Sequence, residues 1–151
     1  MNTFKTIFAV AAIALSAIAC EKNDPAPQEE LKEVNANNIS GKWELHEWDG
    51  AKMLDGTYVY LDIVRNGQTY TMYQNVDSFS NVPHVVTGSY AFIVDPALGT
   101  IIRGDYDHDS GEWNHRYIIK KLTASEMLWV QKEDPAKTQL FVRIDTIPVA
   151  N

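Results

Sequence analysis

The chain of 151 residues contains one cysteine, Cys20, which stands close to the N-terminus. Without a second thiol it cannot form an internal disulfide, so its stability has to come from buried apolar surface. Basic residues are also few: 13 stand against 20 acidic ones, a net charge of −7 at pH 7. This balance excludes nucleic acid as an expected partner. The length suits a single domain with one core.

Motifs of enzymes and of metal sites are missing from the sequence as well. It has no Gly-x-Ser-x-Gly elbow, no glycine-rich phosphate loop and, with Cys20 set aside, no thiol nucleophile. Its four histidines do not stand at metal-ligand spacing, being His46, His84, His108 and His115. We therefore expect a protein that is not an enzyme and that uses no cofactor and no metal.

Alternating carboxylates at Asp105, Asp107 and Asp109 resemble the opening of a calcium loop. That loop needs glycine at its sixth position and glutamate at its twelfth. Here the seventh position holds Gly111 and the twelfth holds Arg116. A solvated acidic hairpin is the favoured interpretation, with a calcium site as the alternative.

The N-terminus reads as a targeting segment. Residues 1–19 combine a basic start at Lys5, an apolar run over 7–15 and small residues just before Cys20, and the run is too short to span a bilayer. The combination resembles a bacterial lipobox, which implies removal of residues 1–19 and acylation of Cys20. We expect a lipoprotein of a Gram-negative outer membrane, periplasmic or surface-exposed, that contacts the membrane through its acyl chains. The alternative is an ordinary secreted protein that is cleaved elsewhere.

Residues 20–38 are predicted to form a disordered, acidic tether. They carry Pro25, Pro27 and five acidic side chains, with too few apolar groups to offset the entropy of ordering. The 18 residues after Cys20 would reach about 55 Å at roughly 3 Å per residue. The residues directly after Cys20, namely Glu21, Lys22 and Asp24, resemble export signals of surface lipoproteins in some Gram-negative bacteria.

Alternation of apolar and polar residues dominates the chain from Ile39 onward, and it predicts strands. Turn-forming pairs such as Asn66-Gly67 and Asp134-Pro135 separate the alternating runs. The predicted strands are residues 42–48, 58–64, 68–74, 85–94, 99–106, 113–122, 127–132 and 138–145.

Such a chain has no helical stripe long enough for a crossover connection, so neighbouring strands should pair antiparallel. An open meander of eight strands would leave two long unpaired edges, whereas closure removes them. We therefore expect an all-β domain over residues 39–151: an eight-stranded, up-and-down antiparallel barrel. A β-sandwich is the alternative, because the same strand spacing serves both.

Two segments resemble lipocalin-like lipoproteins of Gram-negative bacteria, a resemblance that covers about 105 residues. Ile39-Ser40-Gly41-Lys42-Trp43 opens the first strand, and Phe141-Val142-Arg143 lies in the last. The resemblance implies that Trp43 plugs the barrel floor beside Gly41 and that Arg143 lies across its indole. The chain departs from the family pattern at residues 122–127, which lack Thr-Asp-Tyr.

Seven side chains are candidates for the barrel interior on the basis of strand parity. They are Tyr70, Met72, Tyr90, Phe92, Tyr106, His115 and Tyr117. An eight-stranded barrel has room for its own side chains or for one small ligand. The first hypothesis is a small apolar or aromatic ligand held in the barrel mouth.

The second hypothesis is a filled barrel that binds a protein partner or inhibits a hydrolase through loops such as residues 75–84. That loop carries Val76, Phe79 and Val82 among polar residues. A third possibility, a carbohydrate binder, would use Trp48 or Trp129 as an exposed stacking platform.

Overall fold

The computed structural model describes residues 29–76, 84–108 and 110–149. They form an all-β protein with one short helix, α1 (Ala36–Ile39). The strands are β1 (Gly41–Trp48), β2 (Ala51–Lys52), β3 (Val59–Val64), β4 (Thr69–Gln74), β5 (His84–Asp95), β6 (Gly99–Tyr106), β7 (Tyr117–Leu122), β8 (Glu126–Gln131) and β9 (Thr138–Ile144). Within the described residues no helix is long and apolar enough to cross a membrane.

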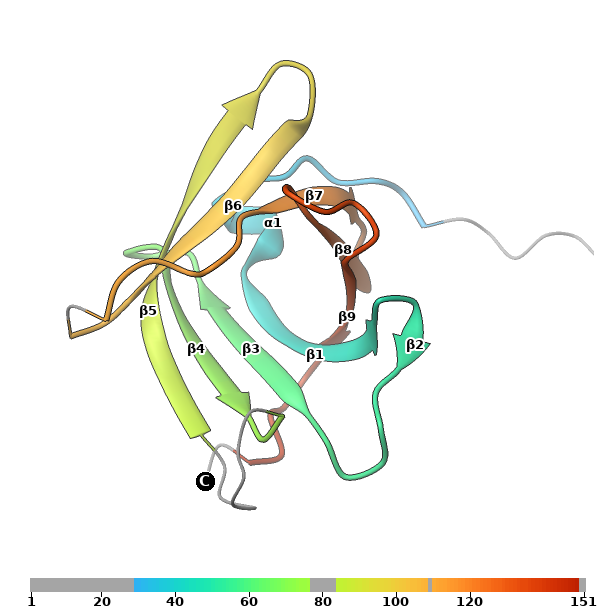
Figure 1. The fold of residues 1–151 in the computed structure, drawn as a ribbon, viewed down its shortest axis with the longest axis vertical. Helices are drawn as coiled ribbons and strands as arrows, with labels where there is room; N and C mark the ends of the chain where they lie inside the picture. The colour runs from blue at the N-terminus through green and yellow to red at the C-terminus, as the bar shows by residue number, and fades with distance from the viewer. Residues whose placement is uncertain (1–28, 77–83, 109, 150–151) are drawn as a thin grey trace, which may run out of the picture.

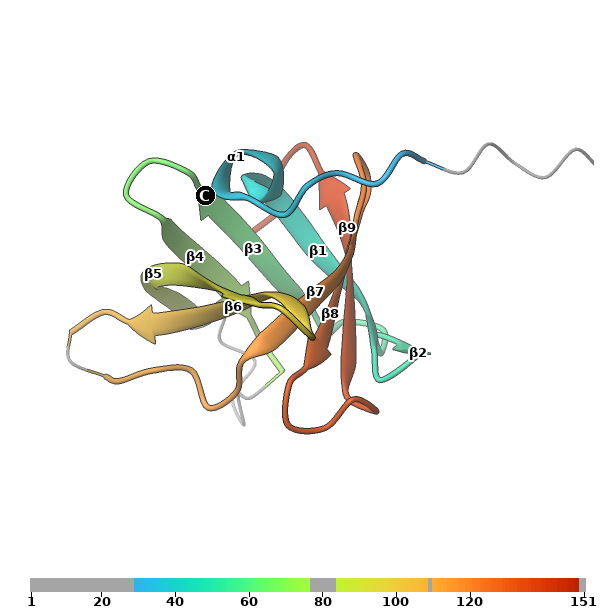
Figure 2. The same cartoon turned by 90° about the horizontal axis from the view of Figure 1, so that it is seen from above.

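The strands form a closed antiparallel barrel. Each of β3 to β8 pairs with the next strand in the chain, β1 pairs with β3, and pairing of β1 with β9 closes the ring (Figures 1 and 2). The expected barrel of eight strands is confirmed, with β2 added beside β1, and the β-sandwich alternative is wrong. Closure pairs β1 with β9, the strands that would otherwise stand at the two ends of an open eight-stranded meander.

Side-chain alternation fills the barrel as the sequence predicted. On β3, for example, Val59, Leu61 and Ile63 are buried while the residues between them are more exposed. Trp43 of β1 pairs with Leu61 on one side and with Arg143 of β9 on the other. Because paired residues point to the same face of a sheet, these positions fix the inward row of each strand.

The hairpin of β1 and β2 was not among the predicted elements. Asp49 and Gly50 form its turn with positive φ angles of 52° and 76°. These angles suit the tight hairpin turns in which Asp-Gly is preferred. The Asp49 carboxylate accepts hydrogen bonds from the Thr138 backbone N at 3.0 Å and from the Lys137 Nζ at 2.8 Å.

The sixth predicted strand, residues 113–122, is shorter in the structure because β7 begins at Tyr117. Only two residue pairs join β6 to β7, Ile101 with Ile118 and Ile102 with Tyr117. Before β7 the chain lies beside β6 for a short stretch, where Asp105 forms an isolated antiparallel bridge with Glu112 and the Trp113 backbone N donates to the Gly104 carbonyl at 2.8 Å. The alternation in the sequence therefore includes residues 113–116, which lie outside β7 in the structure.

The expected tether, residues 20–38, differs from the structure in its last ten residues, which lie on the barrel. The Lys32 backbone N donates to the Leu122 carbonyl at 2.8 Å, and the Glu29 carboxylate accepts from the Ser125 Oγ at 2.8 Å. Asn35 caps α1 by accepting from the Asn38 N. Ile39 after it is fully buried in the core. The apolar Ile39 and the cap anchor a segment whose composition alone predicted disorder.

The closed end of the barrel, called the floor here, is built around Arg143. Its guanidinium carbon lies 4.1 Å from the centre of the Trp43 ring. It donates to three carbonyls: Ser40 at 2.7 Å, Ala124 at 2.8 Å and Asn38 at 2.9 Å. Gly41 has a φ of 131°, and a Cβ there would collide with the guanidinium. The three residues that the resemblance grouped therefore lie together and join α1, β1 and the β7–β8 turn.

Candidate ligand pocket

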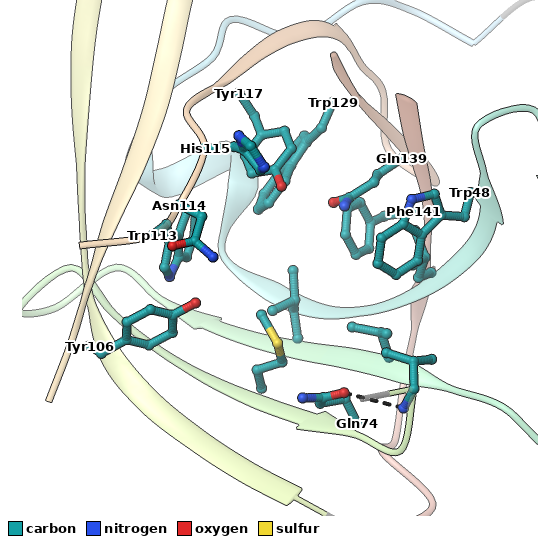
Figure 3. A pocket seen from close by; sticks show the side chains of 15 residues that line it. Trp48, Gln74, Tyr106, Trp113, Asn114, His115, Tyr117, Trp129, Gln139 and Phe141 are labelled. Carbon is teal, nitrogen blue, oxygen red and sulfur yellow. Dashed lines mark hydrogen bonds between the residues drawn. The ribbon is translucent and has the colours of Figure 1, made fainter. Parts of the chain in front are cut away.

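The opposite end of the barrel, called the mouth here, contains a pocket of about 290 Å³ (Figure 3). This is close to the lower end of the range for small-molecule sites. Its 15 lining residues come from seven barrel strands, from Val76 and from the segment before β7. They are Leu45, Trp48, Val59, Leu61, Met72, Gln74, Val76, Tyr106, Trp113, Asn114, His115, Tyr117, Trp129, Gln139 and Phe141.

One wall of the pocket is aromatic. A continuous series of ring contacts leads from Trp113 to Trp129 and on to Phe141, with centroid distances of 5.9 and 4.9 Å. Tyr117 packs on Trp129 at 5.3 Å. The facing wall is aliphatic and contains Leu61 and Met72. The space between the walls is suited to a flat ring, since ring faces and a thioether both attract aromatic groups.

Two glycines make room for the Trp113 and Tyr70 rings against the sheet. A Cβ on Gly104 of β6 would overlap the Trp113 ring, and a Cβ on Gly88 of β5 would overlap the Tyr70 side chain and the Asp105 carbonyl. Both rings therefore sit closer to the sheet than any other residue at 88 or 104 would allow. The Trp113 Nε1 donates to the Tyr70 hydroxyl at 2.7 Å. Burial raises the pKa of Tyr70 to about 12, although the hydrogen bond from Trp113 opposes the rise.

The outer part of the pocket is polar without being charged. Asn114 and His115 are exposed there, whereas Tyr106, Tyr117 and Gln139 are half-buried. Burial raises the pKa of Tyr117, offset in part by a hydrogen bond from the Gln139 side chain. The His115 Nδ1 lies 2.9 Å from the Gln131 Nε2. The rim therefore offers hydroxyl, amide and imidazole groups.

The inner part of the pocket is largely apolar. Its fully buried lining residues are Leu45, Val59, Leu61, Trp129, Phe141 and one polar residue, Gln74, whose Oε1 accepts from the Val76 backbone N at 3.2 Å. The Trp129 Nε1 is buried and has no hydrogen-bond partner among the described residues. Buried donors normally have a partner, so this wall holds one unused donor.

A second, more polar cavity of about 260 Å³ adjoins the pocket and shares Trp48, His115, Tyr117 and Gln139 with it. It also contains Asp49 and Lys137, whose side chains pair at 2.8 Å. Lys137 holds the pKa of Asp49 below its usual value. Close to the rim, the Asp49 carboxylate is therefore paired with Lys137, and the Glu133 carboxylate lies 4.0 Å from the His115 Nδ1.

Four of the seven predicted interior residues line the pocket: Met72, Tyr106, His115 and Tyr117. Tyr70 is buried behind Trp113. The remaining two pack toward the floor, where Phe92 contacts Tyr90 edge-on at 5.6 Å and the Tyr90 hydroxyl donates to the Val64 carbonyl at 3.3 Å. Alternation reveals which face of a strand is buried but not the height of a residue along the barrel axis, which is why these sets differ.

The prediction did not include much of the aromatic wall among the ligand-binding candidates. Phe141 shares strand parity with Arg143, and this parity was the available signal for its inward position. Trp129 is only 3% exposed, so the idea that it forms an exposed carbohydrate platform is wrong. Trp48 does lie at the mouth and is 42% exposed.

Several predicted features fall partly outside the described residues. These are Cys20 with the leader, residues 77–83 of the loop 75–84, and Asp109 of the acidic stretch. Among the residues that the structure does describe, no group of three or more histidine, aspartate or glutamate side chains is arranged to hold a metal ion.

Comparisons with known proteins add little to this geometry. No family model matches the chain, and no curated protein matches it. The chain is similar to one solved structure, the NMR structure of a protein from Bacteroides uniformis ATCC 8492, with 19% identity and a TM-score of 0.49. That match covers 75% of this chain and 94% of the other. A proposal about function has to be argued from the pocket itself.

Proposed function

We propose that this protein is a membrane-anchored, lipocalin-like binding protein that holds a small apolar or aromatic ligand in the mouth of its barrel. The observation that carries the proposal is the pocket of about 290 Å³ between an aromatic and an aliphatic wall. Protein interiors are close-packed, and a space of this size lined by rings is typical of a ligand site. The Trp43 and Arg143 pair at the floor supports the lipocalin-like part of the proposal.

The geometry of the two barrel ends gives the anchored protein an orientation. Glu29 is held at the floor end by Ser125 and stands nine residues after Cys20. Nine residues span at most about 30 Å, roughly half the reach expected for a tether that ends at residue 38. With Cys20 acylated, the floor would face the membrane and the mouth would open away from it.

Native mass spectrometry tests the ligand-binding proposal. The full chain is expressed in a Gram-negative host, purified in lipid nanodiscs and released in the instrument. We expect a reproducible added mass of a few hundred daltons or less that is lost on denaturation. Met72→Trp, which fills the pocket from its aliphatic wall, should abolish the added mass. Val85→Trp, on the 59% exposed Val85 of β5, should retain it.

A bare mass for the wild-type chain, or equal adducts in both variants, would contradict ligand binding in this pocket. The alternative function, a module that binds a protein through loops at the mouth, would then be preferred. The intact mass of the same sample tests the anchor separately, because acylation requires a mature chain that starts at Cys20 and carries the mass of its acyl groups.

A further inference from the structure

We infer that the pocket selects an uncharged, flat aromatic ring of about ten non-hydrogen atoms that carries a small hydrogen-bonding group on its outer edge. This inference rests on the proposed ligand-binding function and narrows it to a chemical class. It depends on the charge, shape, polarity gradient and size of the pocket.

Charge is the first discriminator. Among the 15 described lining residues there is no aspartate, glutamate, lysine or arginine. A charged group moved into such a site loses its hydration without gaining a counter-ion, which is costly. Opposite charges in the adjoining cavity, Asp49 and Lys137, already satisfy each other at 2.8 Å, and the Glu133 Oε2 lies 4.0 Å from the Nδ1 of the rim residue His115. An ionic ligand would have to compete for one of these groups or remain unpaired.

Shape is the second discriminator. In Figure 3 the rings of Tyr117, Trp129 and Phe141 lie on one side of the cavity and the Gln74 side chain, from the same strand as Met72, on the other. Flat rings make offset or edge contacts with such a wall, and the Met72 sulfur adds a favourable contact with a ring. A puckered, saturated ring of the same composition would fit this slot less closely.

Polarity sets the orientation of the ligand. The buried lining is apolar apart from Gln74, whereas hydroxyl, amide and imidazole groups are gathered at the rim. A monosaccharide has hydroxyls on every side, so several of them would be buried at the apolar end without partners. A ring with its single polar group directed toward Asn114, His115 and Gln139 buries no polar group of its own at the apolar end.

Size follows from the volume. A water molecule occupies about 30 Å³ in the liquid, so 290 Å³ holds on the order of ten water-sized groups. Benzamide, with nine non-hydrogen atoms, is therefore a suitable probe. Benzoate and benzylammonium change its charge, cyclohexanecarboxamide removes its flatness, and glucose distributes its polar groups over the whole surface.

The test is a titration of the full chain in lipid nanodiscs with each probe, read by quenching of tryptophan fluorescence, with empty nanodiscs as the blank. Trp113 and Trp129 in the wall provide the signal. We expect saturable binding of benzamide, at least tenfold tighter than that of each of the other four probes. Equal or tighter binding of benzoate, benzylammonium, cyclohexanecarboxamide or glucose would overturn the inference but leave the proposed ligand-binding function intact. Failure of all five probes to bind would overturn the inference, and the native mass measurement would then decide the broader function independently.

A pair of variants tests whether the probes bind in the pocket. Gln139→Glu introduces a carboxylate at the rim and should weaken benzamide at least tenfold while strengthening benzylammonium. Thr69→Glu adds the same charge at an exposed position of β4 and should leave both affinities unchanged. Near-ultraviolet circular dichroism confirms that each variant is folded. Identical affinities in the two variants would contradict the assigned binding position.

Discussion

The contribution of Arg143 to the floor leads to a quantitative prediction. Its guanidinium makes three hydrogen bonds to carbonyls, at 2.7, 2.8 and 2.9 Å, and lies over the Trp43 ring. Hydrogen bonds from charged groups contribute about 1.5–3 kcal/mol each in buried settings, and a cation–π contact adds about 1 kcal/mol. Because Arg143 is only partly buried, we reduce each hydrogen bond to about 1 kcal/mol. Arg143→Met should therefore lower the free energy of unfolding by about 3–5 kcal/mol.

The conservative variant separates charge from geometry. Arg143→Lys keeps the positive charge but has no planar fork, so it can reach one carbonyl and should lose about 2–3 kcal/mol. Urea unfolding of the full chain, followed by tryptophan fluorescence, measures both losses, provided that the denaturant slope is unchanged. Arg65→Met is the matched control, because Arg65 is exposed and, in the part of the chain that the structure describes, its side chain donates to the Asn37 side chain alone; no measurable change is expected. A loss below about 1 kcal/mol in Arg143→Met, or equal losses in Met and Lys, would refute the reasoning.

Three further predictions concern the pocket wall and the core. Gly104→Ala places a Cβ against the Trp113 ring, so we expect a loss of about 1–3 kcal/mol of stability and a changed tryptophan emission spectrum; an unaltered spectrum would contradict the close contact. The pKa of Tyr70 is about 12 in the folded chain against about 10 when unfolded, so its stabilising effect should be complete below pH 10 and lost as the pH rises toward 12. Tyrosinate absorbance at 295 nm should show a late component approaching pH 12 that is reduced in Tyr70→Phe, and an unchanged late component in that variant would refute this. Ile39→Ala should cost about 2–5 kcal/mol by chemical denaturation, since Ile39 is fully buried, whereas a negligible effect would show that residues before β1 do not belong to the core.

The fold was predicted from the sequence with few errors because alternation and turn chemistry are local signals. Seven of the eight predicted strands correspond closely to β1, β3, β4, β5, β6, β8 and β9, and the eighth is shortened to β7. The β2 hairpin was overlooked although Asp49-Gly50 carries the turn signal that marks it. The late start of β7 at Tyr117 has no local signal, since pairing with β6 depends on a second strand and not on alternation within residues 113–122.

The pocket was predicted only in part, for a geometric reason. Strand parity correctly predicted that Met72, Tyr106 and Tyr117 point into the barrel. It predicted Tyr90 and Phe92 as lining residues in the same way, although these two lie near the floor. Phe141 lines the pocket because β9 pairs with β1, a contact between strands that are far apart in the sequence. Residues that are far apart in the chain meet at one height of the barrel through the stagger of the strands, and this stagger is not encoded in any single strand.

The sequence by itself determined the all-β class, the antiparallel order of the strands and the absence of an internal disulfide, because these follow from alternation, short turns and the cysteine count. The tertiary structure alone decided the rest. Strand register sets Arg143 over Trp43, and small residues at Gly88 and Gly104 let two rings lie close to the sheet. Closure of the ring then leaves a space at the mouth that the aromatic side chains do not fill. The volume of that space is the difference between the enclosed room and the packed side chains, a quantity that belongs to the assembled barrel and not to any segment of the chain.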